Sequence, residues 1–424
     1  MTMDPVPSPR PDVPAASSTF GRGNESKRFA LVSAVFLMAT AASGPGFITQ
    51  TATFTQTMGA AFAFGILASV VIDYIVQINI WRIVAATRMR ASDIANAAIP
   101  GSGYLLAFLV ILGGLFFNIA NVAGAGLGLN ALVGLDPKIG GALSALLAIG
   151  IFLNKRAGGV MDRTMIALGV IKIALILFVA YSASPPVGEA LRQTVWPDTI
   201  DFPTITTIVG GTVGGYLTYA GAHRLLDKGL VGKENIPSVT KAALNGITVT
   251  GIMRFILFLG ILGVVSSGVT LDLSGRTANP AAQAFGHAVG EFGFRVFGLI
   301  FWAAGMSSII GAAYTSVSFM TAFKTGMSDR ARSYATVVFI SVSLAIFLAI
   351  GTTPAALLVF VGGFNGLVLP IGLTIILYAA WARRDLMGDY RHPVWLFGLG
   401  VATAALTWWM GYRSIGPIFA FLSR

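Results

Sequence analysis

Long apolar segments, each close to the length that crosses a bilayer, follow one another along almost the whole chain from residue 29 onward. A spanning helix needs roughly 20 mostly apolar residues, and eleven segments, 15 to 33 residues long, are candidates. They lie near residues 29–61, 62–81, 104–129, 139–153, 164–182, 204–222, 241–267, 294–323, 333–350, 355–380 and 393–412. The pattern predicts an all-α polytopic membrane protein with about eleven transmembrane helices.

Two of these segments are interrupted in the middle. The first contains Gly44, Pro45 and Gly46, and the sixth contains four glycines between Gly210 and Gly215. Proline removes a backbone donor, and hydrocarbon cannot satisfy backbone groups freed by a break. If spans 1 to 5 and 6 to 10 form two halves, each half begins with a broken helix. Such paired interruptions point to the substrate site of an inverted-repeat transporter, although glycines also permit close helix packing.

The same pattern predicts the organisation of the chain. Residues 1–28 are rich in Pro, Ser and charge, and we expect a disordered cytoplasmic tail there. The predicted parts after it are a transporter domain at 29–412, made of a first repeat at 29–182, a second repeat at 204–380 and an extra helix at 393–412, and a short carboxyl-terminal tail at 413–424.

Composition and charge agree with a membrane protein. The chain is 55% hydrophobic and 11% charged, with a formal net charge of +11, and a soluble protein carries about 25% charged residues. The Lys and Arg residues stand in small groups between apolar segments, so we expect no nucleic-acid partner. With a cytoplasmic amino terminus, 20 of the 28 fall in cytoplasmic segments. We expect an integral protein of the bacterial inner membrane in that orientation.

Several kinds of chemistry are not indicated. The chain has no Cys, which excludes disulfides and thiolate metal sites. No phosphate-cradling loop, nucleophile triad or zinc motif is present in the sequence. We therefore expect neither an enzyme nor a cofactor.

Four segments resemble a known family. They are FNIANVAGAGLGLNAL (117–132), GGTVGGYLTYAGA (210–222), AAGMSSIIGAAYTSVS (303–318) and NGLVLPIGLTII (365–376). Together they resemble the NRAMP family of divalent-metal transporters over residues 30 to about 412. The resemblance implies a LeuT-type fold, a 5+5 inverted repeat with helices 1 and 6 broken, and a substrate bound at the breaks.

The chain departs from the family pattern where that family binds metal. The family's helix-1 signature is Asp-Pro-Gly-Asn, and this chain has Gly44 to Phe47 there. On helix 6 the family's Met falls at Gly214, and its two His positions fall at Tyr216 and Gly221. Broken helices without those ligands keep free amides at one half-helix end and free carbonyls at the other. Such a pocket suits a small carboxylate or a zwitterion.

The alignment and the polar pattern together give the candidate residues, and no metal ligand is among them. We expect substrate binding by residues at the two breaks: Gly44, Pro45, Gly46, Phe47, Thr49, Gln50, Thr53, Gly214, Gly215, Tyr216, Thr218 and Tyr219. We expect a role in the pathway or in coupling for Asp73, Asn118, Asn121, His223, Arg224, Asp227 and Asn365. The family's acidic helix-3 positions fall at the two Asn residues of helix 3, which cannot titrate.

Two of these assignments have a structural alternative. Asp73 lies deep in the second span, and intramembrane carboxylates are usually functional, but Asp73 could instead pair with Lys172 or Arg254. His223, with Arg224 and Asp227, could form an inner gate, or the segment could be an ordinary cytoplasmic helix end.

The predicted function is that of an NRAMP-like secondary active transporter that works by alternating access. We expect a lipid bilayer as its surroundings, H⁺ or Na⁺ as a coupling ion, and a small carboxylate or amino-acid-like solute as substrate. One alternative is a divalent cation of the Mg²⁺ or Mn²⁺ type, held largely hydrated by carbonyls. A second is a membrane sensor that does not transport.

Overall fold

The computed structural model describes residues 44–153, 170–212, 216–227, 229–275, 277–323, 327–350 and 353–420. Within these ranges all regular secondary structure is helical, and no strand is present. The α-helices are α2 (Pro45–Met58), α3 (Phe62–Thr87), α4 (Ala91–Ala98), α5 (Ser102–Val133), α6 (Pro137–Leu153), the helix Val170–Ser182, α8 (Val187–Val195), α9 (Phe202–Gly210), α10 (Tyr216–Asp227), α11 (Ile236–Ser266), α12 (Pro280–Phe319), α13 (Asp329–Ala349), α14 (Pro354–Ala382) and α15 (Val394–Ala420). Short 3₁₀ turns are η1 (Gly59–Ala61), η2 (Lys233–Asn235), η3 (Met320–Ala322) and η4 (Arg384–Met387).

The all-helical membrane architecture is confirmed, and most of the described helices overlap predicted spans, whereas α4 and α8 lie between them. Seven helical stretches of the described chain are long and apolar enough to cross a membrane, or eight if a bent pair is one span. One of the seven joins α2 and α3 over 43 residues, about twice the length of a single span. The sixth predicted span is absent from that count because it is divided into α9 and α10, which are each short.

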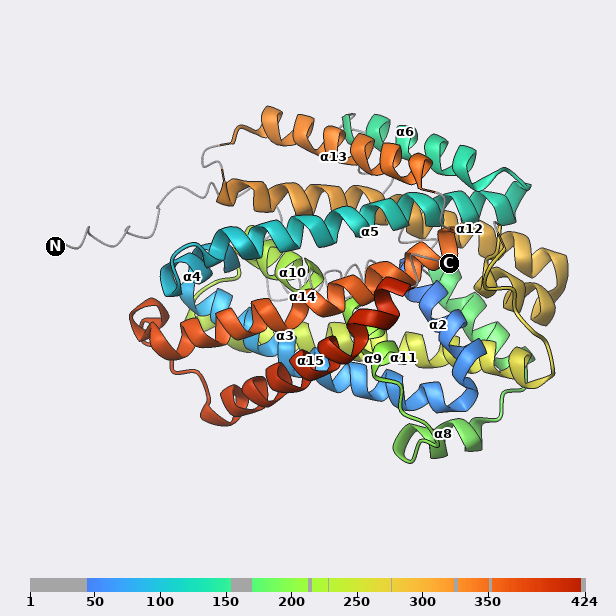
Figure 1. Ribbon diagram of the computed structural model, residues 1–424, viewed down its shortest axis with the longest axis horizontal. Coiled ribbons are helices and arrows are strands. Elements are labelled where there is room, and N and C mark those ends of the chain that lie inside the picture. The colour runs from blue at the N-terminus through green and yellow to red at the C-terminus, as the bar shows by residue number, and fades with distance from the viewer. Residues whose placement is uncertain are drawn as a thin grey trace, which may run out of the picture.

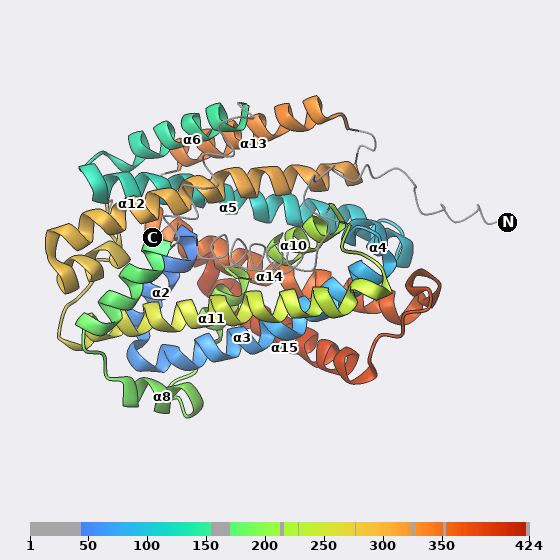
Figure 2. The same ribbon diagram turned by 180° about the vertical axis from the view of Figure 1, so that it is seen from behind.

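The helices form layers (Figures 1 and 2). α5 and α12 pack along each other and have α6 and α13 on their outer side. α14 packs against α5 and α9, and α11 packs against α3. The broken elements α2, α9 and α10 therefore lie inside the bundle. The longer helices α3, α5, α11, α12 and α14 pack around them.

Close approach of these layers depends on glycines in α5. A Cβ placed on Gly128 would lie 2.4 Å from the backbone nitrogen of Trp302 in α12, and one on Gly124 would lie 2.4 Å from the Cβ of Pro45 in α2. Without side chains at these positions, the helices pack backbone against backbone. Part of the glycine content thus serves helix packing, but these α5 glycines are not the ones at the two breaks.

Two boundaries differ from the sequence prediction. α15 continues to Ala420, so the predicted tail at 413–424 is wrong for its first eight residues, where Ser414 and Ile418 are buried. The helix persists because its apolar face still packs against the bundle. α12 begins at Pro280, well before residue 294, and is kinked at Gly290, which has a φ of 77°. Residues 1–28 lie outside the described residues.

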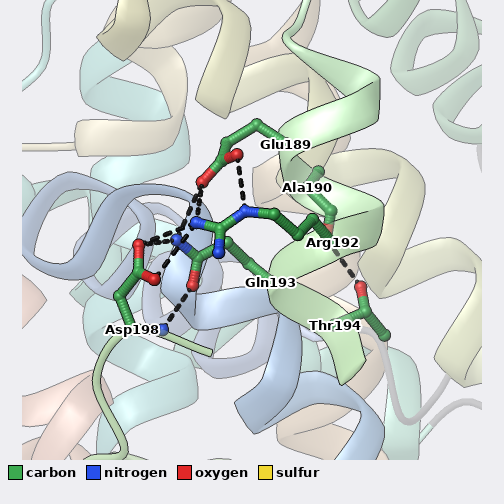
Figure 3. A network of polar contacts seen from close by, with 6 residues as sticks. All are labelled: Glu189, Ala190, Arg192, Gln193, Thr194 and Asp198. Atoms are coloured by element: carbon green, nitrogen blue, oxygen red, sulfur yellow. Dashed lines mark hydrogen bonds and ion pairs between the residues drawn. The ribbon is translucent and has the colours of Figure 1, made fainter. Parts of the chain in front are cut away.

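α8 is a surface helix between spans. It is bent by 107° from the helix Val170–Ser182. Its exposed Arg192 binds Glu189 and Asp198, and Gln193 joins both acids (Figure 3). Hydrogen bonds from Arg192 lower the pKa of Glu189 to about 2.

Candidate functional site

The first break is described from Gly44 onward. Gly44 is extended, with φ −71° and ψ −176°, and Pro45 occupies the first turn of α2, where its missing N–H costs nothing. Pro45, Gly46 and Phe47 are buried. The Gly-Pro pair therefore starts a helix inside the bundle, as the sequence pattern predicted.

The second break separates α9 from α10. α9 ends at Gly210 and α10 begins at Tyr216, while Gly214 and Gly215 lie outside the described residues. Asn365 of α14 accepts a hydrogen bond on Oδ1 from the backbone N–H of Tyr216, at 3.3 Å. Its Nδ2 donates to the carbonyl of Val361, at 3.0 Å. Asn365 thus satisfies a backbone donor that the break leaves free at the start of α10.

Gln50 joins the two breaks. Its Nε2 donates to the carbonyl oxygen of Leu358 in α14, at 3.1 Å. A Cβ on Gly211 would lie 2.4 Å from Gln50 Oε1, and one on Gly362 would lie 2.3 Å from Nε2. The amide therefore fits between the end of α9 and α14 only because both positions are glycine.

The threonines of α2 divide into two kinds. The hydroxyls of Thr51, Thr55 and Thr57 donate hydrogen bonds to backbone carbonyls four residues earlier in the same helix. These hydroxyls are therefore already hydrogen-bonded within α2. Thr49 is fully buried, and its hydroxyl has no hydrogen-bond partner among the described residues. Gln50 Oε1 is also unpartnered there. These two oxygen atoms of α2 are therefore candidates for binding a ligand next to the break.

Asp73 lies in α3 and contacts the end of α9. It is 3% exposed, and its Oδ2 accepts a hydrogen bond from Thr212, at 2.8 Å. Its Oδ1 has no partner among the described residues. Asp73 and Arg254 form no salt bridge in the described part of the chain, so the alternative of a direct ion pair between them is not supported.

Arg254, on α11, is the most unusual side chain near the breaks. It is 1% exposed, and its guanidinium carbon lies 4.0 Å from the centre of the Phe47 ring. Nη1 donates weakly to the carbonyl of Ile208, at 3.4 Å. Nε and Nη2 have no partner in the described part of the chain. The sequence marks Arg254 only as one of two Lys or Arg residues inside predicted spans, and that intramembrane charge was the signal that could have identified it.

Other predicted residues lie farther from the breaks. Asn118 donates to Ser343 of α13, at 3.1 Å, which is a helix-packing contact. Asn121 is buried in the same helix. His223 stacks on Phe319, with ring centres 3.9 Å apart. The side chains of Arg224 and Asp227 lie outside the described residues, so the gate pair stays a prediction.

The second half of the sixth span carries two more candidates, and a third lies in α2. Thr218 and Tyr219 are buried, and neither hydroxyl has a partner among the described residues. The Thr218 carbonyl accepts from the indole of Trp81, at 2.9 Å. Thr53 is buried in α2. Their roles in substrate binding stay predictions.

A family model for natural resistance-associated macrophage protein-like (Nramp) sequences matches residues 35–416. The chain belongs to the Nramp family. A crystal structure of an Eremococcus coleocola manganese transporter in complex with an aromatic bis-isothiourea substituted compound is 16% identical. It covers 94% of this chain and 89% of its own, with a TM-score of 0.67. Mhp1, a nucleobase-cation-symport-1 family transporter, is 15% identical over 93% of this chain and 92% of its own, with a TM-score of 0.56.

Two bacterial relatives are much more similar in sequence. The uncharacterized membrane protein YcsG of Bacillus subtilis is 50% identical over 385 residues, which are 91% of this chain and 94% of YcsG. An uncharacterized membrane protein of Haemophilus influenzae is 49% identical over 370 residues, or 87% and 91% of the two chains. The Nramp resemblance and the LeuT-like fold are confirmed, and Nramp proteins are membrane transporters rather than enzymes. The manganese transporter structures fit the divalent-cation alternative better than the carboxylate substrate.

Proposed function

We propose that this Nramp protein is a secondary active transporter that carries a small solute with a carboxylate group, by alternating access around α2 and the α9–α10 break. The observation that carries the proposal is the buried guanidinium of Arg254. Its Nε and Nη2 lie on one edge of a planar group, and this edge binds both oxygens of a carboxylate at once. A buried cation whose edge has no partner among the described residues is suited to an anionic group of the substrate.

The position of Arg254 supports this proposal. It lies against Phe47 at the start of α2 and against Ile208 at the end of α9, so it contacts both broken spans. Alternating access changes how these elements meet. The affinity of Arg254 for a substrate would therefore differ between the outward-open and inward-open states, and binding would shift the equilibrium between them.

The second candidate substrate is a divalent cation. Family membership favours it, and three buried oxygens near the breaks are unpartnered by described residues: Thr49 Oγ1, Gln50 Oε1 and Asp73 Oδ1. Mg²⁺ binds oxygen ligands while keeping several waters. The positive charge of Arg254 opposes this reading, because a like charge at the site raises the free energy of a bound dication.

Uptake into proteoliposomes separates the two candidates. The purified full chain is given radiolabelled acetate, lactate, glycine, alanine or a small lactam acid, and in parallel manganese, under inward H⁺ or Na⁺ gradients. We expect gradient-driven uptake of at least one carboxylate. Entry of manganese together with failure of every acid would overturn the carboxylate proposal. Uptake of any solute would also exclude the sensor alternative.

Calorimetry with Mg²⁺ and Mn²⁺ tests the cation directly. The wild-type chain should bind neither ion, whereas the double variant Gly44→Asp with Phe47→Asn restores two oxygen ligands of the family signature and should bind Mn²⁺. Binding by the wild type would favour the cation. Absence of any gain in the double variant would contradict the alignment of the first break.

We propose an inner-membrane location with a cytoplasmic amino terminus, on the strength of the Lys and Arg distribution. Because the chain has no Cys, single Cys variants can be labelled without any background. Arg88→Cys should be reached only from the cytoplasm and Arg192→Cys only from outside. The opposite pattern would reverse the orientation.

A further inference from the structure

The side chain of Thr212 lies between Asp73 and the last turn of α9. Its Oγ1 is 2.8 Å from Asp73 Oδ2, 2.8 Å from the carbonyl oxygen of Ile208 and 3.1 Å from the carbonyl oxygen of Val209. A hydroxyl has one proton to donate, and its oxygen can also accept. With Asp73 ionised, the Thr212 hydroxyl can donate fully either to the carboxylate or to the α9 carbonyls, but not to both at once.

A proton on Asp73 resolves this competition. Protonated Oδ2 donates to Thr212 Oγ1, and the Thr212 hydroxyl then donates to the Ile208 carbonyl, so that each close contact has its own hydrogen. The existing distances fit both charge states of Asp73 without any movement of the backbone. The hydrogen-bond geometry around Asp73 therefore accommodates both the protonated and the ionised carboxyl group.

The charges around Asp73 decide when the proton is taken up. Thr212, just after α9, lies 2.8 Å from the carboxylate, and the Ile208 carbonyl that Thr212 also contacts accepts a hydrogen bond from Arg254 of α11, at 3.4 Å. Both Asp73 and Arg254 are at least 97% buried. At a pH where Asp73 is ionised, its charge offsets that of Arg254 across the Ile208 carbonyl. An incoming carboxylate adds one negative charge to a region of low dielectric, where an unbalanced charge is costly.

We infer that Asp73 is the proton-coupling residue of this transporter, and that it takes up one proton each time a monocarboxylate binds to Arg254. The inference rests on the proposed carboxylate substrate. The proton comes from the aqueous phase to which the site is open and bonds to a carboxylate oxygen of Asp73. The substrate carboxylate replaces Asp73 as the counter-ion of Arg254, so the net charge of the buried site stays the same. Release on the other side returns both substrate and proton.

Calorimetry on the full chain in detergent tests this coupling. The probe is the tightest-binding monocarboxylate of the panel of acids used for uptake, titrated in two buffers of different ionisation enthalpy so that protons are counted. The wild type should take up one proton per bound anion, and above the titration midpoint its affinity should fall about tenfold per pH unit. Asp73→Asn should bind the same probe with no proton uptake and no pH dependence in that range.

Asp198→Asn is the matched control, because it removes an exposed carboxylate of α8's network and should leave the proton count at one. The proton count of the wild type needs no variant, so the test holds even if Asp73→Asn does not fold. Binding of the probe with no proton uptake by the wild type would overturn the inference while leaving the carboxylate substrate intact. So would coupling to Na⁺ instead of H⁺. Failure of every acid in the panel to bind would instead overturn the proposed function itself.

Discussion

Two arginines of this protein present the same guanidinium edge to very different surroundings. On the surface, Arg192 donates from Nε and Nη2 to the two oxygens of Glu189, at 3.0 and 2.7 Å (Figure 3). In the core, the same two nitrogens of Arg254 have no partner among the described residues. The surface pair is complete and exposed, where ion pairs contribute little. The buried arginine is incomplete, which is costly for stability and points to a ligand.

The largest expected effect comes from removing the buried guanidinium. Arg254→Gln should reduce carboxylate uptake about 100-fold or more, because two charge-assisted hydrogen bonds to the substrate are lost. Arg192→Gln should change uptake less than about twofold, as expected of an exposed pair. Uptake into proteoliposomes measures both, with gel filtration to verify folding. Equal losses in the two variants would remove the distinction between the arginines.

A smaller effect is expected for the threonine that contacts Asp73. Thr212→Val removes a hydrogen bond to a buried carboxylate and should lower the free energy of unfolding by about 1.5–3 kcal/mol. Thr194→Val is the control on the surface, where the hydroxyl only donates to the Ala190 carbonyl of its own helix, and it should change stability by less than about 0.5 kcal/mol. Denaturation in mild detergent compares the two. A larger loss in Thr194→Val would contradict the assignment.

The aromatic ring beside Arg254 should matter next. Phe47→Leu keeps an apolar side chain but removes the ring face 4.0 Å from the guanidinium, which should destabilise the fold by about 2 kcal/mol at a desolvated site. Phe54→Leu is the matched control, because Phe54 packs on Phe62 in the same region without a cation. Similar melting temperatures for the two variants would show that only ring packing matters at Phe47.

The smallest effect is the pH response of the surface network. The pKa of Glu189 is lowered from its ordinary value near 4.5 to about 2 by hydrogen bonds from Arg192. A lowered pKa stabilises the fold above the unfolded value, and that contribution is lost as pH falls from about 4.5 toward 2. Melting curves of wild type and Glu189→Gln should therefore converge in that window. Curves that stay parallel down to pH 2 would mean that the network contributes nothing.

The sequence predicted the membrane-spanning helices and the positions of the two breaks. Membrane-length apolar segments and charge groups between them follow directly from the requirement that a span be apolar. Most of the membrane helices were therefore located, although α12 begins well before its predicted start and α15 ends well after its predicted end. Gly44-Pro45-Gly46 and the glycines after Gly210 marked the two breaks because they disrupt a helix wherever it lies. The end of α15 was misjudged because Arg413, Ser414 and Pro417 interrupt the apolar run, although Ile418 still packs against the bundle.

Only the tertiary structure decided which polar residues meet. The sequence placed Thr49, Gln50 and Asp73 among its candidates. The contact of Thr212 depends on α9 packing against α3, and the contacts of Gly211 and Gly362 depend on α9 and α14 packing beside α2. Arg254 is separated from Phe47 by more than 200 positions in the chain, and no local pattern reports that contact. Periodicity and hydropathy are local quantities, so they determined the spans and their breaks. Burial and partnering depend on which helices pack together, and these decided the chemistry of the site.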